Sequence, residues 1–380
     1  MNFHFNQDEQ DVLDMLHDFC LKEVAPIAAE IDETERFPEE TWHKLADMGM
    51  MGIAYPEEVG GAGMSYVTYI GACEELAKHC ATTSVMVSAH SSLCCWPISE
   101  YGTEAQKEKY LSKLCSGEWL GAFGLTEPGA GTDAAMQKTV AEDKGDHWVL
   151  NGSKIFITNA GFANVFVVFA MTDKSLGTKG ISAFIVERDF PGFKVGSHEK
   201  KMGIRGSSTC ELVFEDCIVP KENLLGEVGK GFKIAMTTLD GGRIGIGAQA
   251  LGIAQAAIDE CVKYTKERVQ FGKRISQFQN TQFQLADMQA KLDGARLLIY
   301  RAAQAKQDHE PYSHLAAMGK LMASEVASDV TRRALQLVGG YGYTREYPFE
   351  RFMRDAKITE IYEGTSEVQR MVISSHLGVK

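Results

Sequence analysis

Apolar residues recur along the chain with two different periods, and the period changes twice. From residue 6 to about 120 the apolar positions have helical spacing, as at Val12, Leu16 and Phe19, which predicts helices. From about 121 to 226 short runs of β-branched and aromatic residues alternate with Gly, Pro, Asn and Asp, which is typical of strands. From residue 232 the helical spacing returns in long stretches. We therefore expect an α+β protein with an N-terminal helical domain at 1–120, a central β domain at 121–231 and a C-terminal helical domain at 232–380.

The expected strands follow one another with no helical stretch between them. They cover residues 148–150, 154–158, 165–169, 181–186 and 211–214. Because parallel strands need long crossover connections, usually helices, we predict an antiparallel sheet. Two helix starts are marked as well. Asn6 and Glu9 have the spacing of a capping box, and Pro38 stands at the expected first position of a helix, before two glutamates that suit the positive end of its dipole.

Composition and charge narrow the class of protein. With 380 residues, 44% hydrophobic and 24% charged, the chain can bury a large core and does not have a disordered composition. Its 39 basic and 51 acidic residues give a formal net charge of −12, which disfavours nucleic acid and anionic membranes as partners. No basic stretch followed by an apolar one opens the sequence, and the apolar run 165–171 is far shorter than a membrane span. We expect a cytoplasmic protein without membrane insertion.

The common signatures of catalytic and metal sites are missing from the sequence. The nine cysteines form no Cys-x-x-Cys pair and no Cys/His cluster with metal-ligand spacing, so we expect reduced, buried thiols and no metal. No phosphate-binding P-loop, His-Glu-x-x-His or Gly-x-Ser-x-Gly motif occurs. The segment 245–250 fits the dinucleotide fingerprint loosely, but it lies within a helical stretch with no strand before it, so we interpret it as a false match.

One segment with an unusual composition is 123–133, Phe-Gly-Leu-Thr-Glu-Pro-Gly-Ala-Gly-Thr-Asp. A turn built from Pro128, Gly129 and Gly131 leaves backbone N–H groups free to approach a ligand. The alternative is a simple connector between the helical and the β domain. The residues alone do not separate the two.

A second unusual segment is 361–369, Ile-Tyr-Glu-Gly-Thr-Ser-Glu-Val-Gln. Ser366 and Gln369 have capping-box spacing, which predicts a helix that begins there and directs its N-terminal amides towards Glu363. The carboxylate would then lie on a tight turn beside a helix start. The alternative is an ordinary solvated turn residue among 51 acidic residues.

Taken together, five motifs closely resemble the acyl-CoA dehydrogenase family of flavoproteins. They are LTEPGAGTD at 125–133, ITN at 157–159, RVQFG at 268–272, QLVGG at 336–340 and IYEGT at 361–365. They follow one another in the family's order over nearly the whole chain. The resemblance implies the family's fold, with a four-helix-bundle-like C-terminal domain. It also implies FAD bound between that domain and the β domain, acyl-CoA as substrate, electron-transferring flavoprotein as partner, and a homotetramer.

The resemblance also assigns roles to individual residues, motif by motif. The catalytic base would be Glu363. The residues expected to contact the flavin or to close the site around it are Phe123, Leu125, Thr126, Thr132, Phe156, Ile157, Thr158, Thr365, Ser366 and Glu367. Those expected to hold the adenine and pyrophosphate of an FAD that reaches across subunits are Arg268, Phe271, Gln279, Gln336, Leu337, Val338, Gly339 and Gly340. Phe156 replaces the tryptophan of many members and keeps an aromatic face.

Four residues match the family's substrate contacts: Thr132, Asp240, Arg243 and Gly364. Without the resemblance, Arg243 would be interpreted as an ordinary charge on a helix surface. With it, we favour a contact to the pantetheine or phosphate of CoA. In the family, the base removes the α proton of the thioester while a hydride leaves the β carbon for flavin N5. Burial should raise the pKa of such a base towards the working pH.

We predict a short, straight-chain substrate, with butyryl-CoA the best match, converted to its trans-2-enoyl thioester or formed from it. In family members that act on some branched or long chains, the base lies on the helix that carries the residue matching Arg243, immediately before that residue. This chain has Gly242 at that position, which leaves Glu363 as the base candidate. No arginine lies between Arg36 and Arg188 to pair with the second carboxylate of glutaryl-CoA, although a lysine could do so. Two alternatives stay open: an acyl-CoA oxidase of the same fold that uses O₂, and a non-catalytic acyl-CoA-binding protein.

Overall fold

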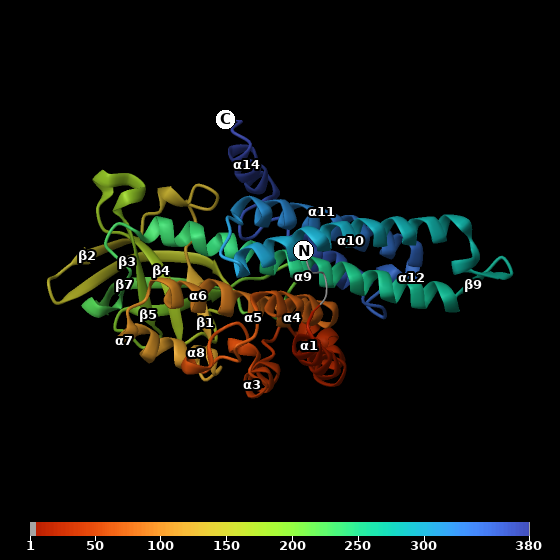
Figure 1. Ribbon diagram of the computed structural model, residues 1–380, viewed down its shortest axis with the longest axis horizontal. Coiled ribbons are helices and arrows are strands. Elements are labelled where there is room, and N and C mark those ends of the chain that lie inside the picture. The colour runs from red at the N-terminus through yellow and green to blue at the C-terminus, as the bar shows by residue number, and fades with distance from the viewer. Residues whose placement is uncertain (1–4, 380) are drawn as a thin grey trace.

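The computed structural model describes residues 5–379, which run through helices, then a sheet, then helices again (Figure 1). This order confirms the predicted α+β class. The N-terminal part is helical, with α1 Gln7–Phe19, α2 Ala28–Thr34, α3 Glu39–Asp47, α4 Tyr66–His79, α5 Ala81–Ser88, α6 Trp96–Tyr101, α7 Glu104–Gln106 and α8 Ser112–Cys115. A π-helical segment, Ala89–Cys95, joins α5 to α6.

The central part is one twisted sheet with strand order β6-β7-β3-β2-β4-β5-β8, to which β1 adds beside β4. Its strands are β1 Gly121–Gly124, β2 Val140–Asp143, β3 His147–Ile157, β4 Val165–Met171, β5 Ile181–Glu187, β6 Phe193–His198, β7 Cys210–Pro220 and β8 Leu224–Leu225. Most neighbours are antiparallel, as predicted. The exceptions are β1 along β4 and a single pair between β2 and β4, which are parallel. The loop after β1 and the β2–β3 pair supply the crossover that a parallel pairing needs.

Two strand predictions were wrong in detail. The expected strands at 148–150 and 154–158 belong to the single strand β3, which continues through a register irregularity near Gly152. Gly152 has φ +143°, and the Asn151-Gly152 pair between the two expected strands forms a bulge inside one strand. Strand β6 was not predicted, because it buries only Phe193 and has a polar sequence typical of a sheet edge.

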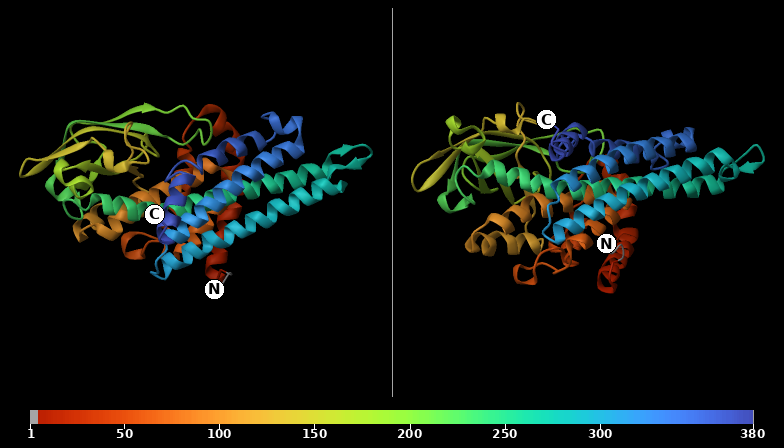
Figure 2. Two further views of the ribbon diagram at one scale, coloured as in Figure 1. Left: turned by 90° about the horizontal axis from the view of Figure 1, so that it is seen from above. Right: turned by 45° about the horizontal axis from the view of Figure 1, so that its top comes forward.

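The C-terminal part is built on three long helices, α9 Gly231–Glu267, α10 Gln279–Gln307 and α11 Ser313–Val338. They run side by side away from the sheet, with the hairpin of β9 Val269–Gln270 and β10 Lys273–Arg274 at the far tip (Figure 2). The chain closes with α12 Gly340–Tyr343, α13 Phe349–Ile358 and α14 Ser366–His376. The loose fingerprint at 245–250 lies within α9, so it was rightly interpreted as a false match.

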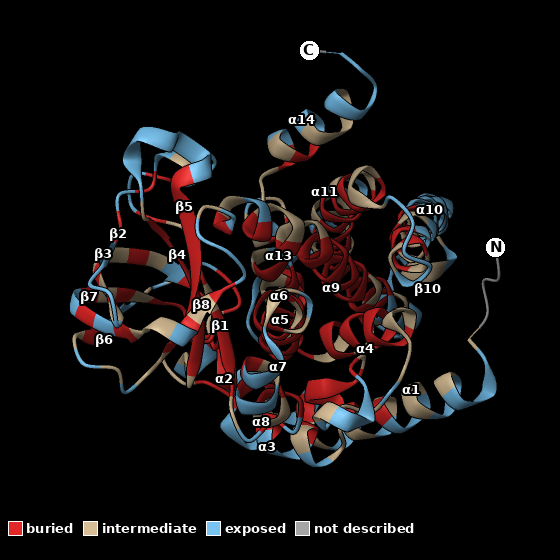
Figure 3. Ribbon diagram, turned by 60° about the vertical axis from the view of Figure 1, so that its left-hand side comes forward, coloured by how far each residue is buried: buried red, intermediate tan, exposed pale blue. Residues whose placement is uncertain are grey.

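Buried residues run along α9 and through strands β4 and β5 (Figure 3). Helix α9 packs on α4, α10 and α11 and also contacts β5, so it joins the three parts of the fold. Close packing there depends on small residues. A Cβ atom at Gly247 would collide with Ile299 of α10, and one at Gly252 would collide with α4. The side chains of α9 are therefore held in fixed positions relative to the other parts of the fold.

The helix starts agree with the sequence to within one residue. Asn6 and Glu9 form the predicted capping box of α1. Pro38 is the N-cap of α3 and not its first helical residue. At α14 the cap is Thr365, whose side chain accepts from the Val368 N–H, and not Ser366 as predicted. Thr365 has the extended backbone that an N-cap needs, while Ser366 is already helical.

All nine cysteines are unpaired and buried, as expected. They are Cys20, Cys73, Cys80, Cys94, Cys95, Cys115, Cys210, Cys217 and Cys261. Burial raises the pKa of Cys73, Cys94, Cys217 and Cys261 to about 12. Among the helices of residues 5–379, none has the length and apolar character that crossing a bilayer requires.

Candidate active site

Glu363 lies on a turn with left-handed backbone between α13 and α14. Its φ is +52° and that of Gly364 is +95°, a conformation that costs an L-residue such as glutamate free energy. The turn is held by its neighbours, because the Gln369 side chain donates to the Gly364 carbonyl at 2.8 Å and the Ser366 N–H to the Glu360 carbonyl at 2.9 Å. The strained turn directs the Glu363 side chain towards α9, where a Cβ atom at Gly242 would collide with Oε2.

The carboxyl group of Glu363 is buried without a hydrogen-bond partner for Oε2 within residues 5–379. Burial raises the pKa of Glu363 to about 7, while the positive charges of Lys320 and Arg243 oppose this shift. Glu363 is therefore not the solvated turn residue of the alternative interpretation. A carboxyl group with a pKa near neutrality and a free oxygen is suited to accept a proton from a bound molecule.

Arg243 is a buried side chain of α9 and not a charge on a helix surface. It is 5% exposed, pairs with Asp240 one helical turn earlier, and leaves its Nε without a partner among the described residues. Burial lowers the pKa of Arg243, and the Asp240 and Glu363 carboxylates counteract this. The pair places one buried cation and one anion beside Glu363, where they can bind a polar ligand.

The loop after β1 is anchored to the sheet by a buried lysine. Lys154 of β3 donates from Nζ to Glu127 Oε1 at 2.7 Å, to Gln137 Oε1 at 3.0 Å and to the Leu125 carbonyl at 3.2 Å. The Ile155 N–H donates to the Thr126 carbonyl at 2.9 Å. A buried ion pair with these hydrogen bonds fixes one conformation of the segment 123–133 against the sheet.

Seven of the ten residues predicted around the flavin lie on β1, the loop after it and the end of β3, whereas Thr365, Ser366 and Glu367 lie at the start of α14. Phe123 and Leu125 pack in one apolar cluster with Leu239 of α9, which directly precedes Asp240. Phe156 has φ +62° and is 59% exposed, so an aromatic ring stands free beside the loop. Thr126 and Thr158 are half-buried, Ile157 is buried, and Thr132 is exposed near the loop's end. A Cβ atom at Gly129 or Gly131 would meet nothing within 4 Å, so the backbone there is open to a ligand.

The predicted adenine and pyrophosphate contacts lie elsewhere, at the tip of the long helices. A cavity of about 470 Å³ there is lined by Tyr264, Arg268, Gln270, Ile275, Leu337, Val338, Gly340, Tyr341 and Thr344. Arg268 lies over the Tyr341 ring, 5.5 Å from its centroid. Phe271 on the hairpin is 94% exposed, and Gln279 and Gln336 are exposed as well. Arg243 lies about a third of the way along α9 and Arg268 is its C-cap, about 37 Å further along the axis.

Two groups of this site were missed by sequence reasoning, Lys154 and Lys320. Lys320 of α11 is fully buried, and its Nζ donates to the Gly364 carbonyl at 2.5 Å. Its signal in the sequence was a charged residue on the apolar face of a helix, next to Leu315, Ala316 and Gly319. Such a lysine is almost never buried unless it is paired, so the pattern could have been noticed.

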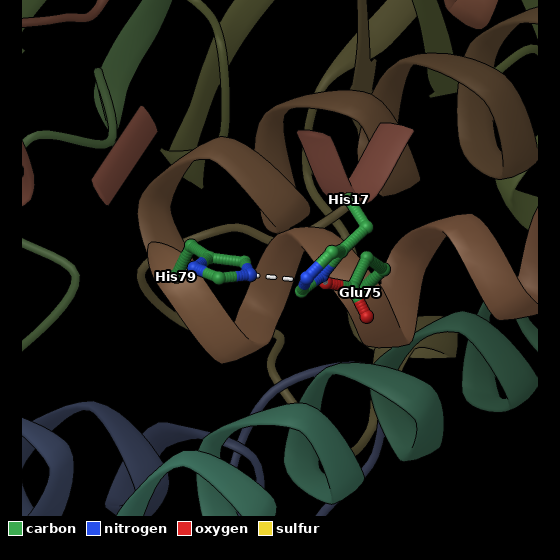
Figure 4. A group of neighbouring side chains, drawn as sticks. All are labelled: His17, Glu75 and His79. Atoms are coloured by element: carbon green, nitrogen blue, oxygen red, sulfur yellow. Dashed lines mark hydrogen bonds and ion pairs between the residues drawn. The ribbon is translucent and has the colours of Figure 1, made fainter. Parts of the chain in front are cut away.

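One cluster away from this site has the side chains of a metal site. His17 of α1 and Glu75 and His79 of α4 place their ligand atoms within 4.8 Å of one another, the only such group found among the described residues (Figure 4). Glu75 accepts from His17 at 2.7 Å and His79 at 2.9 Å with Oε1, and from Lys78 at 2.9 Å with Oε2. These contacts occupy both oxygens and lower the pKa of Glu75 to about 2 against the effect of burial. The cluster therefore forms a hydrogen-bond network that joins α1 to α4.

Comparison with known proteins identifies the family. Models of the acyl-CoA dehydrogenase N-terminal, middle and C-terminal domains match residues 6–118, 122–217 and 229–378. A short-chain specific acyl-CoA dehydrogenase of Clostridium acetobutylicum is 59% identical over 99% of this chain and 100% of its own. The structure of butyryl-CoA dehydrogenase from Megasphaera elsdenii matches with TM-score 0.98 and 54% identity, over 99% of this chain and 100% of that one. A chain from work on the electron transferring flavoprotein of Acidaminococcus fermentans matches with TM-score 0.98, 55% identity and 99% coverage of both chains. By its buried Glu363 turn, its three matching domains and these relatives, the chain belongs to the acyl-CoA dehydrogenase family of flavoproteins.

Proposed function

We propose that this protein is an FAD-dependent dehydrogenase of short, straight-chain acyl-CoA thioesters, with butyryl-CoA the best substrate. The observation that carries the proposal is the carboxyl group of Glu363, buried, strained in its backbone and free at Oε2. The names of the relatives above agree with this substrate class. Glu363 removes the α proton of the thioester, and the product is the trans-2-enoyl thioester or, in the reverse direction, its saturated form.

The chain also provides groups for the thioester and the rest of CoA. The main-chain N–H of Glu363 finds no acceptor among residues 5–379, so it is free to donate to the thioester oxygen as negative charge develops there. The residues proposed to bind the CoA part of the substrate are Arg243, Asp240, Gly364 and Thr132. Arg243 and the Oε2 atom of Glu363 are buried, and low-dielectric surroundings strengthen the interaction of each charge with the substrate.

The residues around Phe156 fit a flavin, because the exposed ring and the open backbone at Gly129 and Gly131 leave a flat group room to lie against them. Phe123, Leu125, Thr126, Thr132, Ile157 and Thr158 would hold the isoalloxazine ring, with Thr365, Ser366 and Glu367 closing the site. When bound, FAD supplies the acceptor for the β hydride. Electron-transferring flavoprotein then takes the electrons.

The contacts at the tip of α9 belong, in our proposal, to the FAD of a neighbouring subunit in a homotetramer. Arg268 is too far along α9 from Arg243 for one small molecule to lie on both. Phe271 at the same tip is 94% exposed, and such apolar groups are typical of a contact surface. Arg268, Phe271, Gln279 and Gln336 to Gly340 would meet the adenine and pyrophosphate from across the interface.

Replacing Arg268 by Ala is therefore expected to weaken FAD binding and the oligomer together, because a ligand that bridges subunits stabilises both. Flavin absorbance per subunit and the elution volume in gel filtration measure the two effects. Arg274→Ala is the matched control, since Arg274 is also an exposed arginine of the hairpin but does not line the cavity. Unchanged flavin content and unchanged size in Arg268→Ala would refute the shared site.

The substrate class is tested by anaerobic flavin bleaching with butyryl-, octanoyl-, isovaleryl- and glutaryl-CoA side by side. We expect the highest kcat/KM with butyryl-CoA, and a higher value with octanoyl- or glutaryl-CoA would make the short-chain assignment wrong. A non-catalytic acyl-CoA-binding protein would bind without bleaching. An oxidase would consume O₂ without an added acceptor, whereas the proposed dehydrogenase needs electron-transferring flavoprotein or an artificial acceptor.

A further inference from the structure

Lys320 is an ionisable group inside the core for which the chemistry proposed above has no use. It lies on α11 between α9 and the catalytic turn, and its side chain is 0% exposed. An ammonium group in such a place is unfavourable unless it finds a partner. The partner is the carbonyl of Gly364, to which Nζ donates at 2.5 Å, and Gly364 directly follows Glu363.

Lys320 thus acts on the turn in two ways. Its hydrogen bond holds a carbonyl within a segment whose two residues both have positive φ, where backbone strain would otherwise be released by rotation. Its positive charge faces the Glu363 carboxyl group. It is the largest influence that opposes the effect of burial on the pKa of Glu363, ahead of Arg243.

The remaining groups around the pair are few. Arg243 faces Glu363 from α9, Tyr66 and Cys73 face it from α4, and Tyr362 precedes it on the turn. Glu360 and Arg243 act on Lys320 as well. The phenols of Tyr66 and Tyr362 and the thiol of Cys73 stay neutral, because burial raises the pKa of each. In its protonated form Lys320 favours the ionised form of Glu363 together with Arg243, and burial lowers the pKa of Lys320 to about 7. Arg243 is already paired with Asp240.

We propose that Lys320 is a positioning residue that fixes the Glu363–Gly364 turn and keeps Glu363 in the ionised form that accepts the α proton. The inference rests on the proposed function, because it gives Lys320 a role only if Glu363 is the base. The hydrogen bond of Lys320 fixes the backbone of the turn, and its charge favours the ionised form of the Glu363 carboxyl group. Substitutions can separate these two contributions.

Lys320→Met removes both the hydrogen bond and the charge, while Lys320→Gln keeps an N–H donor and removes the charge. In anaerobic stopped-flow measurements of flavin reduction, both variants should shift the midpoint of the pH profile upward, by about one pH unit or more. The rate at the high-pH plateau should fall further in Lys320→Met than in Lys320→Gln.

The matched control is Lys201→Met. Burial lowers the pKa of Lys201, and its Nζ donates to a backbone carbonyl, that of Ser207, at 2.8 Å, but it makes no bond to the turn. Its pH midpoint should stay at the wild-type value. An unshifted midpoint in both Lys320 variants, or a loss of thermal stability with equal loss of rate at every pH, would overturn the proposal. Failure of the proposed function is recognised separately, by normal flavin reduction in Glu363→Gln.

Discussion

Replacing Glu363 by Gln is expected to abolish flavin reduction by acyl-CoA, lowering its rate by roughly four orders of magnitude or more. The amide has nearly the same shape as the carboxyl group but cannot accept the α proton. FAD content and acyl-CoA binding should stay close to wild type, because the turn keeps its hydrogen bonds from Lys320 and Gln369 through the Gly364 carbonyl. Stopped-flow spectroscopy under anaerobic conditions measures the rate, and the flavin absorbance measures the bound cofactor.

The role of Glu363 also predicts the direction in which the rate of flavin reduction changes with pH. Only the carboxylate accepts a proton, and the pKa of Glu363 is raised to about 7 by burial. The wild-type reduction rate should therefore rise with pH through about 7 and reach a plateau above it. Glu325→Gln, which changes an exposed acid of α11 that pairs with Arg370, is the control and should retain the profile. Retention of more than about a tenth of the wild-type rate in Glu363→Gln would remove Glu363 from the mechanism.

The second large effect is expected from a single methyl group, in Gly242→Ala. A Cβ atom at Gly242 would overlap Glu363 Oε2 and lie 2.8 Å from Leu93 Cδ2, so the carboxyl group has to move. A displacement of about 1 Å at a reacting group can lower a rate by roughly a hundredfold, and we expect that loss in flavin reduction. FAD binding should be unaffected, since Gly242 touches none of the residues proposed to hold the flavin.

Gly294→Ala is the control for the helix propensity of the substitution. Gly294 lies inside α10, and a Cβ atom there would meet nothing within 4 Å. Alanine should stabilise that helix by about 0.5 to 1 kcal/mol without a change in rate. If Gly242→Ala reduced flavin as fast as wild type, the close approach of α9 to Glu363 would have no part in catalysis.

Features that depend on a few adjacent residues were predictable. The capping box at Asn6, the β character of 165–169 and the false dinucleotide match inside α9 needed only local spacing. The sequence-based predictions were wrong where the same local residue pattern is compatible with two structures. An Asn-Gly pair signals a turn or a bulge, and only the pairing of β3 with β7 decides between them. The cap at Thr365 was placed one residue late because Thr365 and Ser366 are both good N-caps.

The candidate site was less accessible to sequence reasoning because its chemistry comes from burial. Glu363 and Arg243 could be named, but nothing local shows that one carboxyl oxygen is left without a partner or that the arginine is enclosed. Lys320 is 43 residues before Glu363 and meets the turn only through the packing of α11. The roles of the flavin, adenine and substrate contacts stay predictions, which the variants above address.

Because all nine thiols are buried, their modification by a reagent can report local unfolding of the chain. A thiol reagent dissolved in water reacts with thiolates that it can reach, and the folded chain exposes none of its thiols. Burial also raises the pKa of thiols such as Cys73 and Cys94. Each modified cysteine therefore marks a segment that has left the folded state. Six of the thiols lie before β1, two on β7 and one on α9, so the order of modification reports which segment separates first.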